Sequence, residues 1–484
     1  MFFMESLNQA MAAVDAVINS INTVLWSYVL IVLLLGLGLY FTFRTGFVQI
    51  RYLKEMVRLL TEGAGRKTTG KEVSSFQAFC VSTASRVGVG NIAGIAIAIV
   101  LGGPGAIFWM WIVAIVGSAT GFVESTLAQI YKIPKKDGAF HGGPAYYIKN
   151  VLHMPKLAKL FSFLLLTTFA LIYNSLQANT ITLSLHNAFG WDRALIGVVI
   201  SALVALVICG GVHAIARVAE FMVPIMAGIY ILIAIVVTIM NISELPAVLS
   251  LIMTNAFEPQ SAVAGGVGAC IMTGIKRGLF SNEAGEGSVP NAAATANVSH
   301  PVKQGLAQAF GVYVDTLIVC SASAFIILLS GQYQIGGRVT GIELVQHCLS
   351  AEIGGWSIPF IAFMILMFAF SSLVGNYYYG EINLVFLSDK KYVLWAFRVF
   401  VIGMVMFGSI ASLPLVWDLS DLFMAFLAAT NLYAITRLYK YADVALKDYS
   451  RQKAEGIKEP VFNPAVLPSL DGVHAWGVDD EIDD

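Results

Sequence analysis

The chain contains eleven stretches of about 20 mainly apolar residues, which is the length an α-helix needs to cross the hydrocarbon core of a bilayer. Charged residues make up only 12% of the sequence, against roughly 25% in soluble globular proteins. This composition excludes a cytosolic enzyme, a disordered chain and a nucleic-acid-binding protein. The sequence predicts an all-α, polytopic membrane protein with about 11 transmembrane helices. The predicted spans are 24–43, 76–101, 105–131, 158–187, 194–211, 218–240, 262–281, 302–330, 356–379, 392–412 and 415–439.

The distribution of positive charge tests this set of spans. With eleven spans, 25 of the 29 lysines and arginines fall on one side of the membrane, among them Lys276 and Arg277. Arg193 and Arg338 fall on the other side, and Arg86 and Arg398 fall inside spans. Because cytoplasmic loops carry an excess of Lys and Arg, we expect an extracellular N-terminus and a cytoplasmic C-terminus. The expected location is the plasma membrane, here a bacterial inner membrane.

Two spans contain clustered glycines. The second span has Gly88, Gly90 and Gly94 around Asn91, and the seventh has Gly265, Gly266, Gly268 and Gly274. Clustered glycines weaken a helix and favour an unwound segment that lines a cavity, although small residues can instead allow close helix packing. Two interrupted spans five apart run in opposite directions, which indicates an inverted repeat with its binding site at the interface.

The predicted division of the chain follows from this repeat. Residues 1–75 hold the extracellular N-terminus, the first span and a cytoplasmic loop, 76–241 form the first repeat and 242–440 the second. Residues 441–484 are a polar tail that we expect to be mobile and solvated. Segments 245–257 and 341–351 are expected to lie on the membrane surface. The five cysteines form no CxxC pair, so neither a disulfide nor a metal site is expected.

Polar residues inside the spans are candidates for the transport pathway. Asp315 is a candidate cation ligand or proton carrier, and Arg86 is a candidate for a role near a substrate carboxylate. Alternatively, Arg86 pairs with Glu124 or Asp315 and only fixes helix positions. Tyr173 and Gln177, four residues apart and hence on one helix face, could bind a ligand or join helices. Ser371 and Ser372 offer two hydroxyl oxygens of the kind that hard cations prefer, or they bond to the preceding helical turn.

Four long sequence blocks resemble the alanine/glycine:cation symporter family, the sodium:alanine symporters. They are RVGVGNIAG (86–94), GGPGAIFWMWIVAIVG (102–117), RGLFSNEAGEGSVP (277–290) and GNYYYGE (375–381). The resemblance covers about 76–439. It implies the fold of the leucine transporter, in the amino acid–polyamine–organocation superfamily, with a 5+5 inverted repeat and here one extra N-terminal span. It also implies uptake of small neutral amino acids driven by sodium or, less often, by protons.

The resemblance also implies roles for particular residues. Gly88, Gly90 and Asn91 fall in the unwound stretch of the first core helix, whose amides would hold the substrate carboxylate. The Ala84 and Val87 carbonyls, with Ser371 and Ser372, match the sodium site shared across that fold. Ile271 and Thr273 fall near the expected break of the sixth core helix. The predicted substrate-binding set is Gly88, Gly90, Asn91, Tyr173, Gln177, Ile271, Thr273, Ser372 and Asn376, and the predicted cation-binding set is Ala84, Val87, Ser371, Ser372 and Asp315.

One position departs from the family pattern. Asn376 stands where the family often has Trp, which would leave room for a larger polar substrate such as glutamine. The expected function is sodium-coupled import of alanine, glycine or glutamine by alternating access. The alternatives are a proton-coupled transporter, a channel or a membrane sensor. No P-loop, HExxH or GxSxG motif supports ATP-driven transport or an enzyme. Apart from sodium as the coupling ion we expect no cofactor, and no nucleic acid or obligate protein partner.

Overall fold

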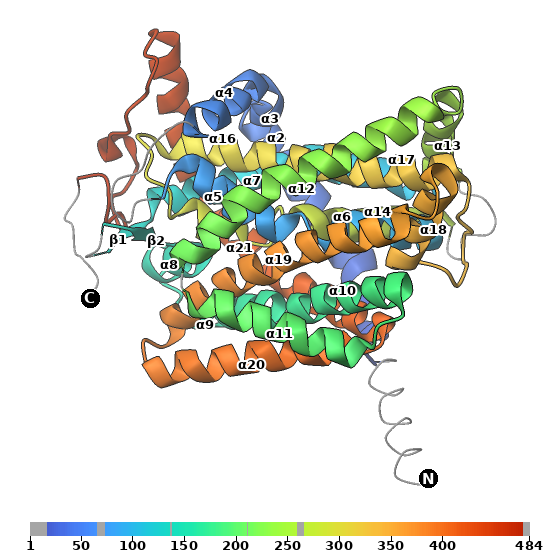
Figure 1. Ribbon diagram of the computed structural model, residues 1–484. Coiled ribbons are helices and arrows are strands. Elements are labelled where there is room, and N and C mark those ends of the chain that lie inside the picture. The colour runs from blue at the N-terminus through green and yellow to red at the C-terminus, as the bar shows by residue number, and fades with distance from the viewer. Residues whose placement is uncertain (1–16, 65–72, 136–137, 211, 259–265, 478–484) are drawn as a thin grey trace.

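The computed structural model describes residues 17–64, 73–135, 138–210, 212–258 and 266–477 (Figure 1). These ranges are almost entirely helical, and their strands, β1 (Ile133–Pro134) and β2 (Phe140–His141), have two residues each. Nine helices in these ranges have the length and composition to cross a membrane. They are Val17–Arg44, Ser75–Gly102, Ala106–Ile130, Pro155–Phe189, Ala219–Met240, Pro301–Ser330, Ser357–Leu387, Lys391–Ile410 and Leu413–Ala454. The predicted all-α, polytopic class is confirmed.

Two shorter helices coincide with the remaining predicted spans. Helix α11 (Arg193–Cys209) has 17 residues and covers the predicted span 194–211. Helix α14 (Gly266–Asn282), also of 17 residues, covers most of the predicted span 262–281, whose first four residues lie outside the described ranges. The total of eleven spans and the 5+5 repeat therefore stay predictions.

Several helices begin where the sequence supplies a cap. At α5 (Ser75–Arg86), the Ser74 hydroxyl accepts from the Gln77 amide while the Gln77 side chain accepts from the Ser74 amide, a reciprocal capping box. At α11 the Asp192 carboxylate accepts from the Leu195 amide. Proline occupies the first turn of α8 (Pro144–Asn150), α9 (Pro155–Leu165) and α16 (Pro301–Val312), where its missing N–H costs nothing.

The long helices lie side by side, and Figure 1 views the bundle with their axes running across the picture. Strands β1 and β2, helix α8 and helix α4 (Leu53–Ala64) lie at one end, called here the hairpin end. Helices α13 (Leu245–Phe257) and α18 (Gly341–Ile353) lie at the other, called the α18 end. The remaining elements are α2 (Ile31–Arg44), α3 (Val48–Arg51), α6 (Val89–Gly102), α7 (Ala106–Ile130), α10 (Asn174–Phe189), α12 (Val212–Met240), α15 (Val289–Ala293), α17 (Ser321–Ser330), α19 (Ser357–Leu387), α20 (Lys391–Ile410) and α21 (Leu413–Ala454).

Three helices contain π-helical turns, at Leu25–Leu30, Leu166–Tyr173 and Tyr313–Cys320. The second joins α9 to α10, and the third joins α16 to α17. Such turns often occur at functional sites, and both of these segments reach the region described below. Of the five cysteines, four are buried and Cys209 is exposed.

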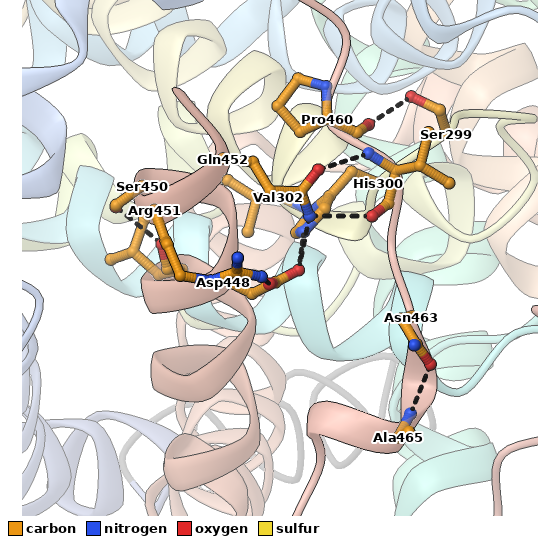
Figure 2. Close-up of polar contacts among 12 residues, drawn as sticks. Ser299, His300, Val302, Asp448, Ser450, Arg451, Gln452, Pro460, Asn463 and Ala465 are labelled. Carbon is orange, nitrogen blue, oxygen red and sulfur yellow. Dashed lines mark hydrogen bonds and ion pairs between the residues drawn. The ribbon is translucent and has the colours of Figure 1, made fainter. Parts of the chain in front are cut away.

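The C-terminal segment does not match the prediction of a mobile, solvated tail. Helix α21 continues to Ala454, well past the predicted span end at 439, and the chain then folds back onto the hairpin end. The Phe462 amide donates to the Ser299 carbonyl (2.9 Å), and the Ser299 hydroxyl donates to the Pro460 carbonyl (2.9 Å; Figure 2). The Trp476 indole donates to the Gln129 carbonyl (3.1 Å). The prediction was wrong because a few buried apolar side chains anchor a segment whose average composition is polar. They are Phe462, Leu467, Val473 and Ala475.

Candidate functional site

The predicted interruption of the second span is present in the structure. Helix α5 ends at Arg86, Val87 and Gly88 are not helical, and α6 begins at Val89; this is called here the α5/α6 break. The Gly88 amide donates to Asn91 Oδ1 (2.9 Å) and the Val89 amide donates to Gln177 Oε1 (3.1 Å). Two backbone amides that have no acceptor within the helix at the break are thus hydrogen-bonded to side chains.

Candidate cation ligands lie on one side of the α5/α6 break. The Ser372 hydroxyl lies 3.0 Å from the Ala84 carbonyl oxygen, and the Ser371 hydroxyl lies 3.5 Å from the same oxygen. Both hydroxyls also donate to the Phe368 carbonyl one turn earlier in α19. Val87, three residues after Ala84, is completely buried. Three oxygens from two helices therefore converge at the end of α5, and oxygen is the ligand type that a hard cation prefers.

At Gly88 the α5/α6 break lies against side chains of α19 and α10. A Cβ atom at Gly88 would lie 2.3 Å from Ser372 Oγ and 3.0 Å from Gln177 Oε1. Gly90, two residues further, leaves room for the Phe280 ring, which a Cβ would meet at 2.7 Å. The Phe280 ring in turn lies 4.7 Å from the Tyr173 ring. The predicted residues Gly88, Gly90, Tyr173, Gln177, Ser371 and Ser372 are thus brought together with Ala84 and Val87.

Asp315 lies in a separate network on the other side of Asn91. The Asn91 Nδ2 donates to an Asp315 carboxylate oxygen, and the Ser281 and Thr316 hydroxyls donate to Asp315 Oδ2 (2.8 and 2.9 Å). Because the same amide accepts from Gly88, Asn91 connects the α5/α6 break to Asp315. The contacts of Asp315 are therefore to Asn91, Ser281 and Thr316, and not to Ser371 and Ser372.

The second interruption lies further along the chain than the sequence predicts. Helix α14 runs without a break through Gly268, Ile271, Thr273 and Gly274, and Gly265 lies outside the described residues. The chain leaves the helix at 283–288, called here the α14/α15 break, where Gly285 (φ 95°) and Gly287 (φ 79°) adopt backbone conformations that favour glycine.

Two glycines of α14, Gly274 and Gly278, serve close packing instead. A Cβ at Gly274 would lie 2.3 Å from the Ala106 carbonyl oxygen, and one at Gly278 would lie 2.6 Å from Val113. The absence of a side chain lets α14 pack directly on α7, as small residues do between membrane helices. Thr273 consequently lies beside Gly102, which is fourteen residues, or about 21 Å of helix, from Gly88. Ile271 lies two residues earlier in the same unbroken helix. The predicted place of both residues beside a break was wrong.

The α14/α15 break brings two further carboxylates into the core, Glu283 and Glu286, which the sequence prediction missed. Ser85 and Ser288 donate to Glu283 (2.8 and 2.6 Å), while Tyr173 donates to Glu286 Oε2 (3.4 Å). Glu286 Oε1 is buried without a hydrogen-bond partner. The signal in the sequence was the pair of acids among glycines in SNEAGEGS, just beyond an apolar run.

Glu124 and Arg86 have partners other than those expected. Glu124 accepts from the Gly285 amide (3.1 Å) and from Asn431 Nδ2 (2.7 Å), so it stabilises the α14/α15 break. Arg86 donates to the carbonyl and the side chain of Gln308 (3.2 and 3.3 Å). Each group therefore has its own hydrogen-bonding partner, and neither depends on the Arg86–Glu124 pair that the sequence suggested.

Asn376 connects the two breaks. Its Oδ1 lies 2.6 Å from Ser85 Oγ, which also lies 2.8 Å from Glu283 Oε1. Ser85 is next to the candidate cation ligand Ala84, and Glu283 opens the α14/α15 break. Asn376 on α19 thus lies where both breaks meet, and its Nδ2 is buried without a partner.

A cavity of about 580 Å³ opens between α6, α14 and α21 at the α18 end. Its lining includes Leu101, Thr273 and Leu413, and towards the breaks Arg277, Trp417 and Asp421. Asp421 accepts from Arg277 (2.6 and 2.7 Å) and pairs with Lys276 (2.9 Å), and the Arg277 guanidinium lies 4.4 Å from the centre of the Trp417 ring.

These contacts correct the predicted placement of Lys276 and Arg277. Both lie within α14 beside the cavity at the α18 end, although the count of positive charges assigned them to the lysine- and arginine-rich side of the membrane. The Trp417 ring also contacts Phe280 (4.9 Å), the residue that covers Gly90. One layer, made by Phe280, Trp417 and the Arg277–Asp421 pair, therefore lies between the cavity and the α5/α6 break.

An unwound helix at the centre of an apolar bundle, with polar side chains and oxygen ligands gathered on it, is the arrangement of a membrane transporter. Residues 11–464 match the sodium:alanine symporter family. The chain therefore belongs to the sodium:alanine symporter family and is a multi-pass membrane protein.

Three relatives illustrate the range of the similarity. "Probable sodium/glutamine symporter GlnT" of Bacillus subtilis is 52% identical over 466 residues, covering 96% of this chain and 97% of that protein. "Amino-acid carrier protein AlsT" of the same organism is 48% identical over 464 residues, with 96% and 97% covered. "Sodium/proton-dependent alanine carrier protein" of Bacillus sp. PS3 is 37% identical over 428 residues, with 84% and 94% covered.

Proposed function

We propose that the protein is a secondary active symporter that imports a small neutral amino acid together with sodium. The observation that carries the proposal is the α5/α6 break, where Ala84, Ser371 and Ser372 present oxygens within hydrogen-bond distance of one another. The names of the relatives support alanine and glutamine as substrates. No covalent chemistry is required, so we assign no enzymatic activity.

Sodium binds between α5 and α19 in this proposal. The Ala84 and Val87 carbonyls and the Ser371 and Ser372 hydroxyls are its ligands, with the hydroxyls turning their lone pairs to the ion. Since Ser372 contacts the break at Gly88, a bound ion orders the break and raises the affinity for the amino acid. By thermodynamic linkage the amino acid raises the affinity for sodium by the same factor.

The amino acid binds at the break itself. Its carboxylate replaces the side-chain acceptors on the amides of Gly88 and Val89, since helix N-termini favour anions. The Gln177 amide, now bonded to the Val89 N–H, then turns to the substrate. Phe280 and Tyr173 close the pocket from the α14 and α10 sides.

The cavity at the α18 end supports an orientation and a gate. The lysine- and arginine-rich loops lie at the hairpin end, so the positive-inside rule puts that end in the cytoplasm and the cavity outside. The layer of Phe280, Trp417 and the Arg277–Asp421 pair is the outer gate. Opening it exposes the break to the outside, and rocking of the interrupted helices exposes the break to the cytoplasm.

Asn376 supports a substrate larger than alanine. An amide at this position leaves more room than Trp and offers a donor and an acceptor. We therefore include glutamine among the substrates. If Asn376→Trp leaves the preference for glutamine over alanine unchanged, this residue does not set substrate size.

A proton-coupled transporter is the second candidate, because one relative is named for both sodium and proton dependence. The purified protein in liposomes separates the candidates. Initial rates of labelled alanine uptake are compared with inward sodium, with an inward proton gradient at equal potassium on both sides, and with neither. The proposal expects uptake above the control only with sodium. Uptake driven by protons alone supports the second candidate, and equal uptake in all three conditions supports a channel.

A further inference from the structure

The α14/α15 break, α19 and the π-helical turn before α10 enclose a ring of polar and aromatic side chains beside the α5/α6 break. Its members form a sequence of contacts: Asn376 with Ser85 (2.6 Å), Ser85 with Glu283 (2.8 Å), and Tyr173 with Glu286 (3.4 Å). The Phe169 ring then connects the Tyr173 ring (4.7 Å) to the Tyr379 ring (5.5 Å). Asn376 and Tyr379, three residues apart on α19, share one helix face and close the ring.

Three ring members have a polar atom that no group in the described part of the chain satisfies. Glu286 Oε1, Asn376 Nδ2 and the Tyr379 hydroxyl are buried without a hydrogen-bond partner. The three residues are at most 1% exposed. An unsatisfied buried polar group costs about 1–3 kcal/mol, so three of them in one ring require an explanation.

The unsatisfied atoms comprise both donors and an acceptor. Ser85 has a single hydroxyl proton for Glu283 and Asn376, so the Asn376 amide can also turn its Nδ2 toward Ser85. In either orientation one of its two polar atoms stays without a protein partner. Glu286 adds an acceptor and Tyr379 adds a hydroxyl that can donate.

The position of the ring matches the end of a long substrate side chain. Ser372, at the cation ligands and Gly88, lies four residues before Asn376 on the same face of α19, about 6 Å along the helix. The single methyl group of alanine bound at the break does not reach that far. The side chain of glutamine, with two methylene groups and a carboxamide, is long enough to reach the ring.

We propose that this ring is the side-chain subsite for a carboxamide, and that Glu286 is a specificity-determining residue that accepts from the amide NH₂ of glutamine. Asn376 and Tyr379 bind the amide oxygen. The inference rests on the proposed amino-acid transport and adds the residues that select the side chain.

The acceptors around the ring also favour glutamine over glutamate. Glu286 faces Glu283 on its own segment and Glu124 on α7. A substrate carboxylate would replace the amide NH₂ with an acceptor facing Glu286, so two acceptors would meet without a hydrogen between them.

The test is competition against sodium-driven uptake of labelled alanine by the purified protein in liposomes. In the wild type we expect glutamine to compete and glutamate not to compete. In Glu286→Gln, the loss of one carboxyl oxygen that accepts from the substrate amide raises the half-inhibitory concentration of glutamine about tenfold. The readout is the ratio of this concentration to the alanine KM of the same variant, which rises by that factor.

Tyr379→Phe provides a second variant that removes one hydroxyl from the ring, and Tyr378→Phe is its matched control. Tyr378 is the next residue of α19, and its side chain points about 100° away around the helix. We expect glutamine to compete three- to tenfold less well in the first variant and as in the wild type in the second.

The outcomes are separable from the proposed function. If the wild type shows no sodium-driven alanine uptake, the proposed function fails. If alanine uptake is intact but Glu286→Gln and Tyr379→Phe leave glutamine competition unchanged, or weaken alanine and glutamine equally, the carboxamide subsite is overturned.

Discussion

A single methyl group added at Gly88 tests the site most sharply. The φ of Gly88 is −141°, so Gly88→Ala does not place a side chain in the left-handed region that favours glycine. The new Cβ would lie 2.3 Å from Ser372 Oγ and 3.0 Å from Gln177 Oε1. Since ordinary contacts begin near 3.4 Å, the Ser372 hydroxyl must move by about 1 Å. The clash therefore falls on one candidate cation ligand and one candidate substrate ligand.

Overpacking of this kind costs about 1–3 kcal/mol. Because the displaced groups bind the ion and the amino acid, we expect the cost to appear in binding, as a 5- to 150-fold rise in the half-saturating concentrations. Linkage requires sodium and alanine to be affected together. Initial rates of labelled alanine uptake into proteoliposomes, over a matrix of sodium and alanine concentrations, measure both values.

Gly36→Ala on α2 is the matched control, because a Cβ at Gly36 would meet nothing within 4 Å. We expect unchanged transport and a slight gain in helix stability, since alanine is the better helix former by about 0.5–1 kcal/mol. If Gly88→Ala transports with the sodium and alanine dependence of the wild type, the α5/α6 break is not the binding site and the reasoning is refuted.

Three further predictions concern the ion, the gate and the C-terminal segment. Ser372→Ala should raise the half-saturating sodium concentration about tenfold by removing one oxygen ligand. Ser409→Ala is the control, because it removes a buried hydroxyl that is bonded only within α20, and it should leave this concentration unchanged. Equal effects of the two variants in flux assays would contradict the cation site. Asp421→Asn should lower the free energy of unfolding by about 3–5 kcal/mol, because it leaves the buried Arg277 without its partner. Asp443→Asn, at an i,i+4 pair with Lys447, should lower it by less than about 1 kcal/mol. Thermal melts of both variants in detergent measure the difference. His300 accepts from the Val302 amide at Nδ1 and contacts Asp448 through Nε2 (3.4 Å), and burial lowers its pKa to about 4 against the opposing effect of Asp448. A depressed pKa stabilises the docked C-terminal segment above pH 6.5, and this stability is lost as the pH falls towards 4. Amide exchange in 455–477 should therefore show the segment docked less stably by about 2 kcal/mol at pH 5 than at pH 7, and His300→Gln should abolish that difference. Stronger docking of the segment at pH 5 would contradict this prediction.

The sequence predicted the α5/α6 break but misplaced the α14/α15 break, and both outcomes have the same physical origin. Glycine serves either a special backbone conformation or a close helix contact, and the two uses look alike in a sequence. At the α5/α6 break, the Asn91 side chain accepts from the Gly88 amide that the break leaves unpaired. Both residues lie within four positions, so the sequence alone was enough to predict this break. The role of Gly274 depends on Ala106 of α7, far away in sequence.

Partners across the bundle account for the other differences. Lys276 and Arg277 were counted on the lysine- and arginine-rich side of the membrane because they lie near that end of the predicted span. Asp421, 144 residues from Arg277, instead stabilises both within α14 beside the cavity. Glu283 and Glu286 were missed because the apolar run that defines a span ends before them. The all-helical class, by contrast, follows from hydropathy alone, because a bilayer requires each spanning segment to satisfy its own backbone.

The central claim, that a sodium gradient drives the amino acid through the site at Gly88, is tested most directly by steady-state accumulation. Proteoliposomes with the purified protein are loaded with labelled alanine at equal concentrations inside and outside, and the imposed sodium ratio is varied on both sides of one. The account predicts that the alanine ratio rises above one with inward sodium, falls below one with outward sodium, and approaches the same ratios more slowly in Gly88→Ala. An alanine ratio of one at every sodium ratio in the wild type would contradict it.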